Sequence, residues 1–137
     1  MAFLDWTDQY ALGVGAMDTQ HKALVASMNA LHARTEAGAP PDELLRLVDA
    51  LAELTQRHFA NEEEHMERIG FPGLVSHKGI HVTLLSKLGA HRAEVAAKGA
   101  PDDKFFAFLK FWLTSHITGI DTKYAEHGAK ATVGAAN

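Results

Sequence analysis

Residues 42–81, DELLRLVDALAELTQRHFANEEEHMERIGFPGLVSHKGIH, contain one predicted helix, a turn and the start of a second predicted helix. In the first half, apolar residues recur at helical spacing, and the same stripe then carries His58 and Glu62, four residues apart. After the breaker Gly70-Phe71-Pro72-Gly73, His77 and His81 again stand four residues apart. Polar groups on an apolar stripe point inward, where burial is unfavourable unless a partner satisfies them. The stretch therefore predicts a helical hairpin with ligand-type side chains inside it.

Helical periodicity extends over most of the chain, and no strand signal or internal repeat interrupts it. Two further breakers are Gly38-Ala39-Pro40-Pro41 and Lys98-Gly99-Ala100-Pro101-Asp102. We predict helices over residues 18–37, 42–69, 74–97 and 102–127, with Asp18 as a cap, an arm over 1–17 and a tail over 128–137. The arm is expected to pack across the helices through Phe3, Leu4, Trp6 and Tyr10. Short connections favour an all-α, antiparallel up-down-up-down four-helix bundle, formed as a single domain over 1–137.

Composition excludes several classes of function. The absence of cysteine removes disulfides, thiolate metal sites and iron–sulfur clusters. A net charge of -4 implies no basic face, so nucleic acid is not an expected partner. The apolar stretches are too short to cross a membrane, and the start lacks the layout of a signal peptide. A cytoplasmic protein is expected.

The ligand-type residues converge at one end of such a bundle. In an antiparallel arrangement, the start of the first and third helices meets the end of the second and fourth. At these places lie His21, His58, Glu62, His77, His81, His116 and Asp121. Because these side chains come from four helices and meet at one level, we predict a metal site.

The remaining histidines fall outside this level. His32 lies roughly 16 Å from His21 along the axis, and His91 about 15 Å from His81, at 1.5 Å per residue. His65 lies a turn nearer the helix end, and His127 is expected in solvent in the last turn or tail. The predicted solvated face beside the site consists of Glu63, Glu64 and Glu67.

Seven ligands are too many for one ion. Two six-coordinate ions need about twelve positions. Five imidazoles, two bridging carboxylates and an oxo or hydroxo bridge fill all but one, which a diatomic molecule could take. A histidine-rich set supplies less negative charge than a carboxylate-rich one, and this favours capture of oxygen over its cleavage.

The assembled motifs resemble the hemerythrin family in its bacterial form, bacteriohemerythrin. They are Asp18-x-x-His21-Lys22, His58-Phe59-x-x-Glu62-Glu63-x-x-Met66, His77-x-x-x-His81 and Trp112-x-x-x-His116-x-x-x-x-Asp121. The resemblance spans about Trp6 to Tyr124 and implies a di-iron oxygen carrier.

The resemblance also implies a role for each residue. One iron would be bound by His77, His81 and His116. The second iron, which keeps the open position, would be bound by His21 and His58. Glu62 and Asp121 would bridge the two ions. The oxygen pocket would be lined by Phe59, Trp112, Leu113 and Ile117.

Three classes of function stay open at this point. The first is reversible dioxygen binding for storage, delivery or sensing, with no enzymatic activity. The second is a di-iron enzyme acting on peroxide or nitric oxide, which needs a proton donor near the site; Tyr124 and Glu63 are candidates. The third is a structural bundle holding zinc or manganese, since histidine and carboxylate accept several metals.

The spacing of His116 and Asp121 predicts a backbone irregularity. Five residues rotate by about 140° on a regular helix, yet both side chains must reach one site. We predict a π-type turn or another helix irregularity between them, eased by Gly119.

Overall fold

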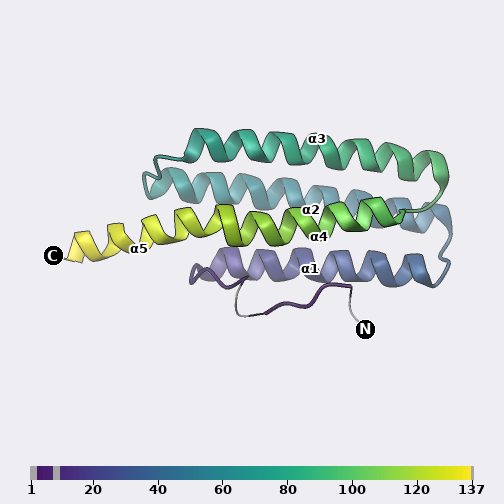
Figure 1. The fold of residues 1–137 in the computed structure, drawn as a ribbon, viewed down its shortest axis with the longest axis horizontal. Coiled ribbons are helices and arrows are strands. Elements are labelled where there is room, and N and C mark those ends of the chain that lie inside the picture. Colours follow the sequence, from purple (N-terminus) through teal and green to yellow (C-terminus); the bar gives the residue numbers. More distant parts are fainter. Residues whose placement is uncertain (1–2, 8–9, 137) are drawn as a thin grey trace.

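Four long helical rods lie side by side in the computed structural model, which describes residues 3–7 and 10–136 and the side chains as far as Ala129 (Figure 1). The first three are α1 (Gly15–Glu36), α2 (Pro41–Arg68) and α3 (Leu74–Lys98). The fourth consists of α4 (Asp103–Ser115), the π-helix η2 (His116–Asp121) and α5 (Thr122–Ala136). Successive rods run in opposite directions, and no strand occurs in the described residues. The all-α antiparallel four-helix bundle is confirmed.

The predicted apolar stripes form the core. Leu24, Met28 and Leu31 of α1 are buried, as are Val48 and Leu51 of α2. On α3 and α4 the buried stripe consists of Leu88, Val95, Phe105, Leu109 and Trp112. The breakers end the helices as expected; Gly99, for example, has a φ of 91° at the end of α3, a left-handed conformation that favours glycine.

The N-terminal arm is attached to α1 by both backbone and side chains. The amide of Leu4 donates to the side chain of Asn29, whose amide in turn donates to the Leu4 carbonyl, both at 2.8 Å. Phe3 stacks on His32 with ring centroids 4.9 Å apart. The predicted packing of the arm across the bundle is therefore confirmed.

Helix α1 begins at Gly15, earlier than predicted, and Asp18 does not cap it. The Asp18 carboxylate instead accepts hydrogen bonds from the backbone amides of Leu12 and Gly13, at 2.8 and 3.2 Å. An acidic residue in a first turn was taken for a cap, but here it ties the end of the arm to the helix.

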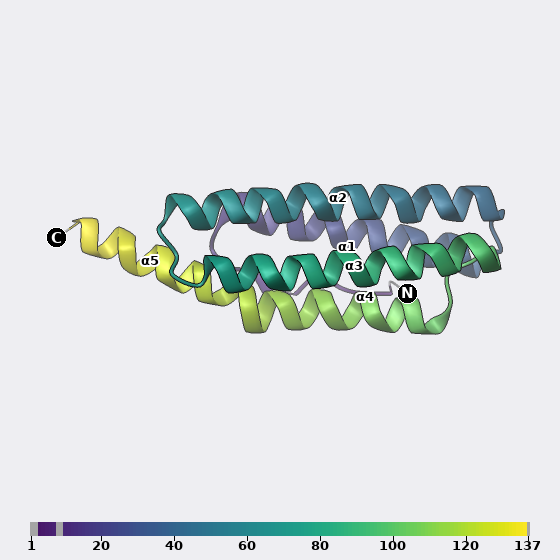
Figure 2. The same ribbon diagram turned by 90° about the horizontal axis from the view of Figure 1, so that it is seen from above.

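The predicted tail is also helical. Helix α5 continues to Ala136 and extends beyond the other rods in both views (Figure 2). Alanine has the highest intrinsic helix propensity, and residues 125–136 are rich in it. His127 is consequently half-buried rather than free in solvent, and its Nε2 lies 3.1 Å from the carbonyl oxygen of Ile69.

Candidate metal centre

The ligand-type side chains meet inside the bundle, near the end where α2 leads into α3. Two groups are close enough together to hold an ion each, with ligand atoms within 4.8 Å of one another. One group is Glu62, His77, His81 and His116; the other is His21, His58, Glu62 and Asp121. All are buried in the bundle. The predicted convergence of these residues is thus present, whatever their individual roles.

The first group has the spacing of ligands around one ion. The Nε2 atom of His116 lies 3.2 Å from Nε2 of His77 and 3.3 Å from Nε2 of His81. Ligand atoms about 2.1 Å from a common ion and at right angles to each other are roughly 3 Å apart. Three imidazole nitrogens at these distances form one face of such an arrangement.

The second group contains fewer imidazoles than the first. The Nε2 atom of His21 lies 3.2 Å from Oδ2 of Asp121 and 3.5 Å from Oε2 of Glu62. The Nε2 atom of His58 lies 3.4 Å from the same Glu62 oxygen. This group has two imidazoles, where the first has three.

Each buried carboxylate turns one oxygen toward each group. Oε1 of Glu62 lies 3.0 Å from Nε2 of His81, whereas its Oε2 faces the second group. Oδ1 of Asp121 lies 3.1 Å from His77 and 3.0 Å from His116, whereas its Oδ2 faces His21. The carboxylates therefore lie between the two sets of imidazoles.

The backbone irregularity that brings Asp121 into the site is a π-helix. It spans His116–Asp121, and both end residues are buried. The predicted π-type turn is confirmed, but the contribution expected from Gly119 is not. Gly119 does not have a positive φ, and a Cβ at this position would meet nothing within 4 Å. The turn therefore does not depend on glycine's conformational freedom.

Three outer contacts hold the ligand-type side chains in place. Nδ1 of His58 lies 2.7 Å from Oε1 of Gln20, and Nδ1 of His81 lies 2.9 Å from Oε2 of Glu63. The hydroxyl of Tyr124 donates to Oε2 of Glu62 at 2.8 Å. Partners of this kind fix the orientation of metal-binding imidazoles and carboxylates.

One of these partners, Gln20, is not predicted from the sequence. The sequence places Glu63 both on a solvated face and among the groups near the site. It follows Glu62 around the helix toward α3 and is only 27% exposed, so the second of these predictions is confirmed and the first is wrong. Gln20 precedes His21 and carried no signal of its own. Tyr124 was named as a group near the site, and its contact with Glu62 agrees with that.

Burial and neighbouring charges shift the pKa values of the buried histidines and carboxylates in opposite directions. Burial by itself lowers the pKa of His21, but Asp121 and Glu62 outweigh it and raise the pKa to about 9. The pKa of His116 is raised to about 9 by the same balance. Burial would raise the pKa of Glu62, and the surrounding histidines hold it well below its usual range. Without a metal, the negative charge is therefore balanced by protons on imidazoles.

The residues fit a metal pair. Several buried polar atoms have no hydrogen-bond partner among the described residues: both nitrogens of His21, Oε1 of Glu62 and both oxygens of Asp121. Most of these atoms lie close to one another, but their geometry does not allow hydrogen bonds between them. Ligand atoms around a common ion are arranged in this way. Leaving them without any partner would cost about 1–3 kcal/mol each.

The other candidate residues surround the two groups. Phe59 stacks on His81 with ring centroids 3.8 Å apart, and Trp112 lies 5.6 Å from Phe59, edge to face. Leu113 and Ile117 are buried in the same core cluster. His32, His65, His91 and His127 belong to neither metal-binding group, as predicted for the first three.

The metal-free protein is expected to lose stability as the pH rises from about 6.5 to about 9. His21 and His116 have folded-state pKa values of about 9 against 6.5 when unfolded, so the stability they contribute is complete below 6.5 and lost through 9. We expect the melting temperature of chelator-treated protein to fall by about 5 °C or more over this range. Metal-loaded protein should show no such fall, because the ions replace those protons. Parallel slopes for the two forms would contradict this.

Comparisons with known proteins agree with the geometry. The family model for the hemerythrin HHE cation binding domain matches residues 12–127. The chain is 31% identical over 126 residues to a bacteriohemerythrin of Stenotrophomonas maltophilia (strain R551-3), which covers 92% of this chain and 82% of the relative. It is 33% identical over 120 residues to a myohemerythrin of Riftia pachyptila, covering 87% and 88%.

Solved structures give the same result. The crystal structure of a leucine-to-alanine variant of hemerythrin matches with a TM-score of 0.84 at 28% identity, covering 93% of this chain and 98% of that one. No helix among the described residues is long and apolar enough to span a membrane. Since the family model and the relatives both extend over most of the sequence, the chain belongs to the hemerythrin family.

Proposed function

We propose that the chain binds dioxygen reversibly at a non-haem di-iron centre and is an oxygen-binding protein rather than an enzyme. One iron would be held by His77, His81 and His116, and the other by His21 and His58. Glu62 and Asp121 would bridge the two, together with an oxo or hydroxo group. The observation that supports this most is the position of the carboxylates, each with one oxygen toward either set of imidazoles.

The unequal imidazole sets support an open position on one ion. The first group has three imidazoles and the second has two, while the carboxylates of Glu62 and Asp121 each lie close to imidazoles of both groups. Bound iron would supply the reversible exchange of electrons with dioxygen. The chain's own contribution would be to fix the rings of His21 and His58, whose centroids lie 4.5 Å apart, and to bury both.

Apolar side chains cover the three-imidazole group. Phe59 stacks on His81, and Trp112 lies against Phe59. On the carboxylate side, Tyr124 keeps its proton, because burial and the neighbouring carboxylates raise its pKa far above the usual range. Its hydroxyl therefore stays a hydrogen-bond donor to Glu62 and steadies the carboxylate that we propose as a bridge.

Elemental analysis followed by a reversibility test examines the proposal. Protein purified from cells should contain about two iron ions per chain, in keeping with the ligand count. After reduction with dithionite and removal of the reductant, exposure to air should produce an oxygen-dependent spectrum that disappears under vacuum. Zinc or manganese in place of iron, or a spectrum that does not reverse, would contradict reversible oxygen binding.

One contact favours the enzymatic alternative, a di-iron enzyme acting on peroxide or nitric oxide. Tyr124 is a buried protic group bonded directly to Glu62. If its proton served turnover, Tyr124→Phe would abolish consumption of peroxide or nitric oxide and leave oxygen binding intact. A protein that turns over neither substrate faster than free iron would exclude this alternative.

Leu113→Ala is expected to leave both ions bound and to change oxygen release or autoxidation by roughly threefold or more. The buried side chain lies one turn before His116 and Ile117 in the same rod, so its loss opens space in the proposed pocket wall. Stopped-flow oxygen release and the rate of spectral decay in air measure the effect. Leu109→Ala, which leaves a similar cavity one turn earlier in α4, is the control. Equal effects of the two substitutions would remove Leu113 from the pocket.

A further inference from the structure

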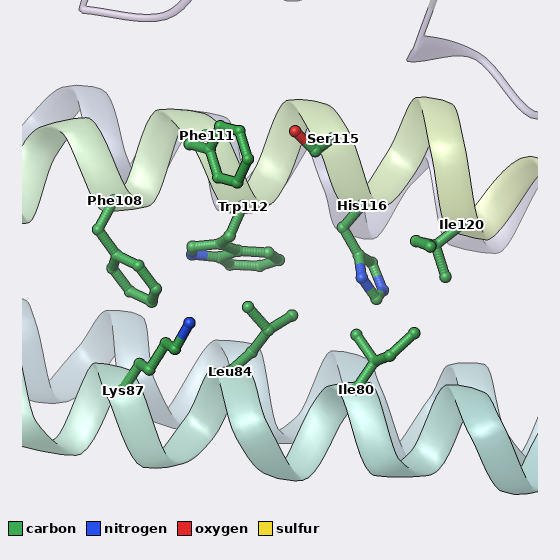
Figure 3. A pocket seen from close by; sticks show the side chains of 9 residues that line it. All are labelled: Ile80, Leu84, Lys87, Phe108, Phe111, Trp112, Ser115, His116 and Ile120. Carbon is green, nitrogen blue, oxygen red and sulfur yellow. The ribbon is translucent and has the colours of Figure 1, made fainter.

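A recess outside the buried cluster opens between α3 and the rod formed by α4 and η2. It has a volume of about 230 Å³, and Figure 3 shows α3 side chains on one side of it and side chains of α4 and η2 on the other. Most of the lining is apolar: aliphatic residues from both sides and three aromatic rings. The lining consists of Ile80, Leu84, Lys87, Phe108, Phe111, Trp112, Ser115, His116 and Ile120.

One end of the recess reaches the proposed metal centre through His116. The Nε2 atom of this imidazole faces the buried cluster, 3.0 Å from Asp121 and 3.2 Å from His77. The ring also lines the recess (Figure 3). A molecule in the recess would therefore be separated from the proposed first iron by a single imidazole.

The opposite end carries a positive charge. Lys87 extends from α3 toward the far end of Trp112 (Figure 3). Residues 74–93 and 104–120, which include all of the lining, contain no aspartate or glutamate, although the whole chain has a net charge of -4. Lys87 forms no ion pair among the described residues. The local charge favours an anion.

The shape and the aromatic walls favour a planar ring. A cavity of about 150 Å³ accommodates one benzene molecule, so this larger, open recess suits two fused rings. Phe108, Phe111 and Trp112 offer ring contacts, and Phe111 is 71% exposed, which a bound apolar molecule would reduce. The indole N–H of Trp112 is buried and has no acceptor among the described residues.

We propose that the recess binds a bicyclic aromatic anion of the hydroquinone class, which reduces the oxidised di-iron centre through His116. This role rests on the proposed function. The hydroquinone loses two electrons and two protons and becomes the quinone. Iron ions held by the proposed ligands would accept these electrons, one on each ferric ion, and the protons would leave to solvent at the open mouth.

Binding is tested without reference to the metals, using the redox-inert probe naphthalene-2-sulfonate. Calorimetric titration of the full chain should give saturable binding of one molecule, and cyclohexanesulfonate should bind at least tenfold more weakly. Lys87→Gln and Phe111→Ala, both at exposed positions, should each weaken binding at least fivefold. The matched controls on α3 are Lys78→Gln and Val82→Ala, which lie outside the recess and should change nothing.

Two results overturn the binding site: no saturable heat with the naphthalene probe, or equal effects of Lys87→Gln and Lys78→Gln. The electron-transfer role has its own test, in which reduced 1,4-naphthoquinone-2-sulfonate is mixed anaerobically with oxidised iron-loaded protein. The reduction rate should saturate with the hydroquinone, reach half-saturation at a concentration at least fivefold higher in Phe111→Ala, and fall when naphthalene-2-sulfonate competes. A rate that rises linearly and resists competition overturns that role. Protein without iron would overturn the proposed function but leave the binding result unaffected.

Discussion

Glu62→Ala is expected to release at least one metal ion per chain and to lower the melting temperature by about 10 °C or more. The carboxylate is fully buried, accepts a hydrogen bond from Tyr124, and lies between both sets of imidazoles. Removing one partner from a buried charged network costs roughly 3–5 kcal/mol. The lost ions would remove the free energy of their binding to the folded state as well.

Metal content by elemental analysis and melting by circular dichroism measure these effects. Glu64→Ala is the matched control, because Glu64 lies on the same helix and is exposed. It should keep the metals and change the melting temperature by less than about 2 °C, as surface substitutions do. Glu62→Gln separates charge from shape, and we expect it to lose metal as well, because an amide nitrogen is not a ligand. Full metal content in Glu62→Ala would exclude a bridging role.

The helical period made the main features predictable. His58 and Glu62 continue the apolar stripe of α2, and His77 and His81 begin that of α3, so their burial follows from spacing alone. Antiparallel topology then brings them to one level. The π-turn followed from the same geometry, since a five-residue spacing conflicts with a single helix face.

Other features depend on packing between helices, which spacing does not describe. Glu63 points sideways from α2 and reaches His81 only because α3 lies next to it. Gln20 reaches His58 because α1 and α2 lie side by side. The recess beside His116 forms where side chains of α3 and α4 fail to fill the space between the helices. The polar periphery of the site therefore needed the structure, whereas its centre did not.

Deleting Ser115 is expected to remove the metal ion that we propose His116 holds, whereas deleting Gly119 should not. Both residues are exposed, both deletions shorten the same rod by one residue, and only the second lies within η2. A π-turn holds one more residue than an α-turn, so five residues across it advance about as far as four do on a regular helix. Without Gly119, His116 and Asp121 would be four residues apart and would share a face of a plain α-helix.

Deleting Ser115 has no such compensation. If the π-turn persists, both His116 and Asp121 turn by about 100° relative to the buried face of α4. If the turn relaxes to an α-helix, Asp121 and Tyr124 again face the interior of the bundle, whereas His116 stays rotated away from it. In either case His116 leaves the cluster, and the three-imidazole group is reduced to two.

Metal content and melting temperature of the two deletion variants distinguish these cases. We expect the Gly119 deletion to keep full metal content and a melting temperature within about 3 °C of the parent, because the side chains of the site keep their positions. The Ser115 deletion should lose about half of the metal and melt at least about 8 °C lower, from the loss of one buried ligand and its ion. Equal loss of metal in both variants would contradict this expectation. It would show that the centre requires the π-turn backbone itself, and that placing His116 and Asp121 on one helix face is not enough.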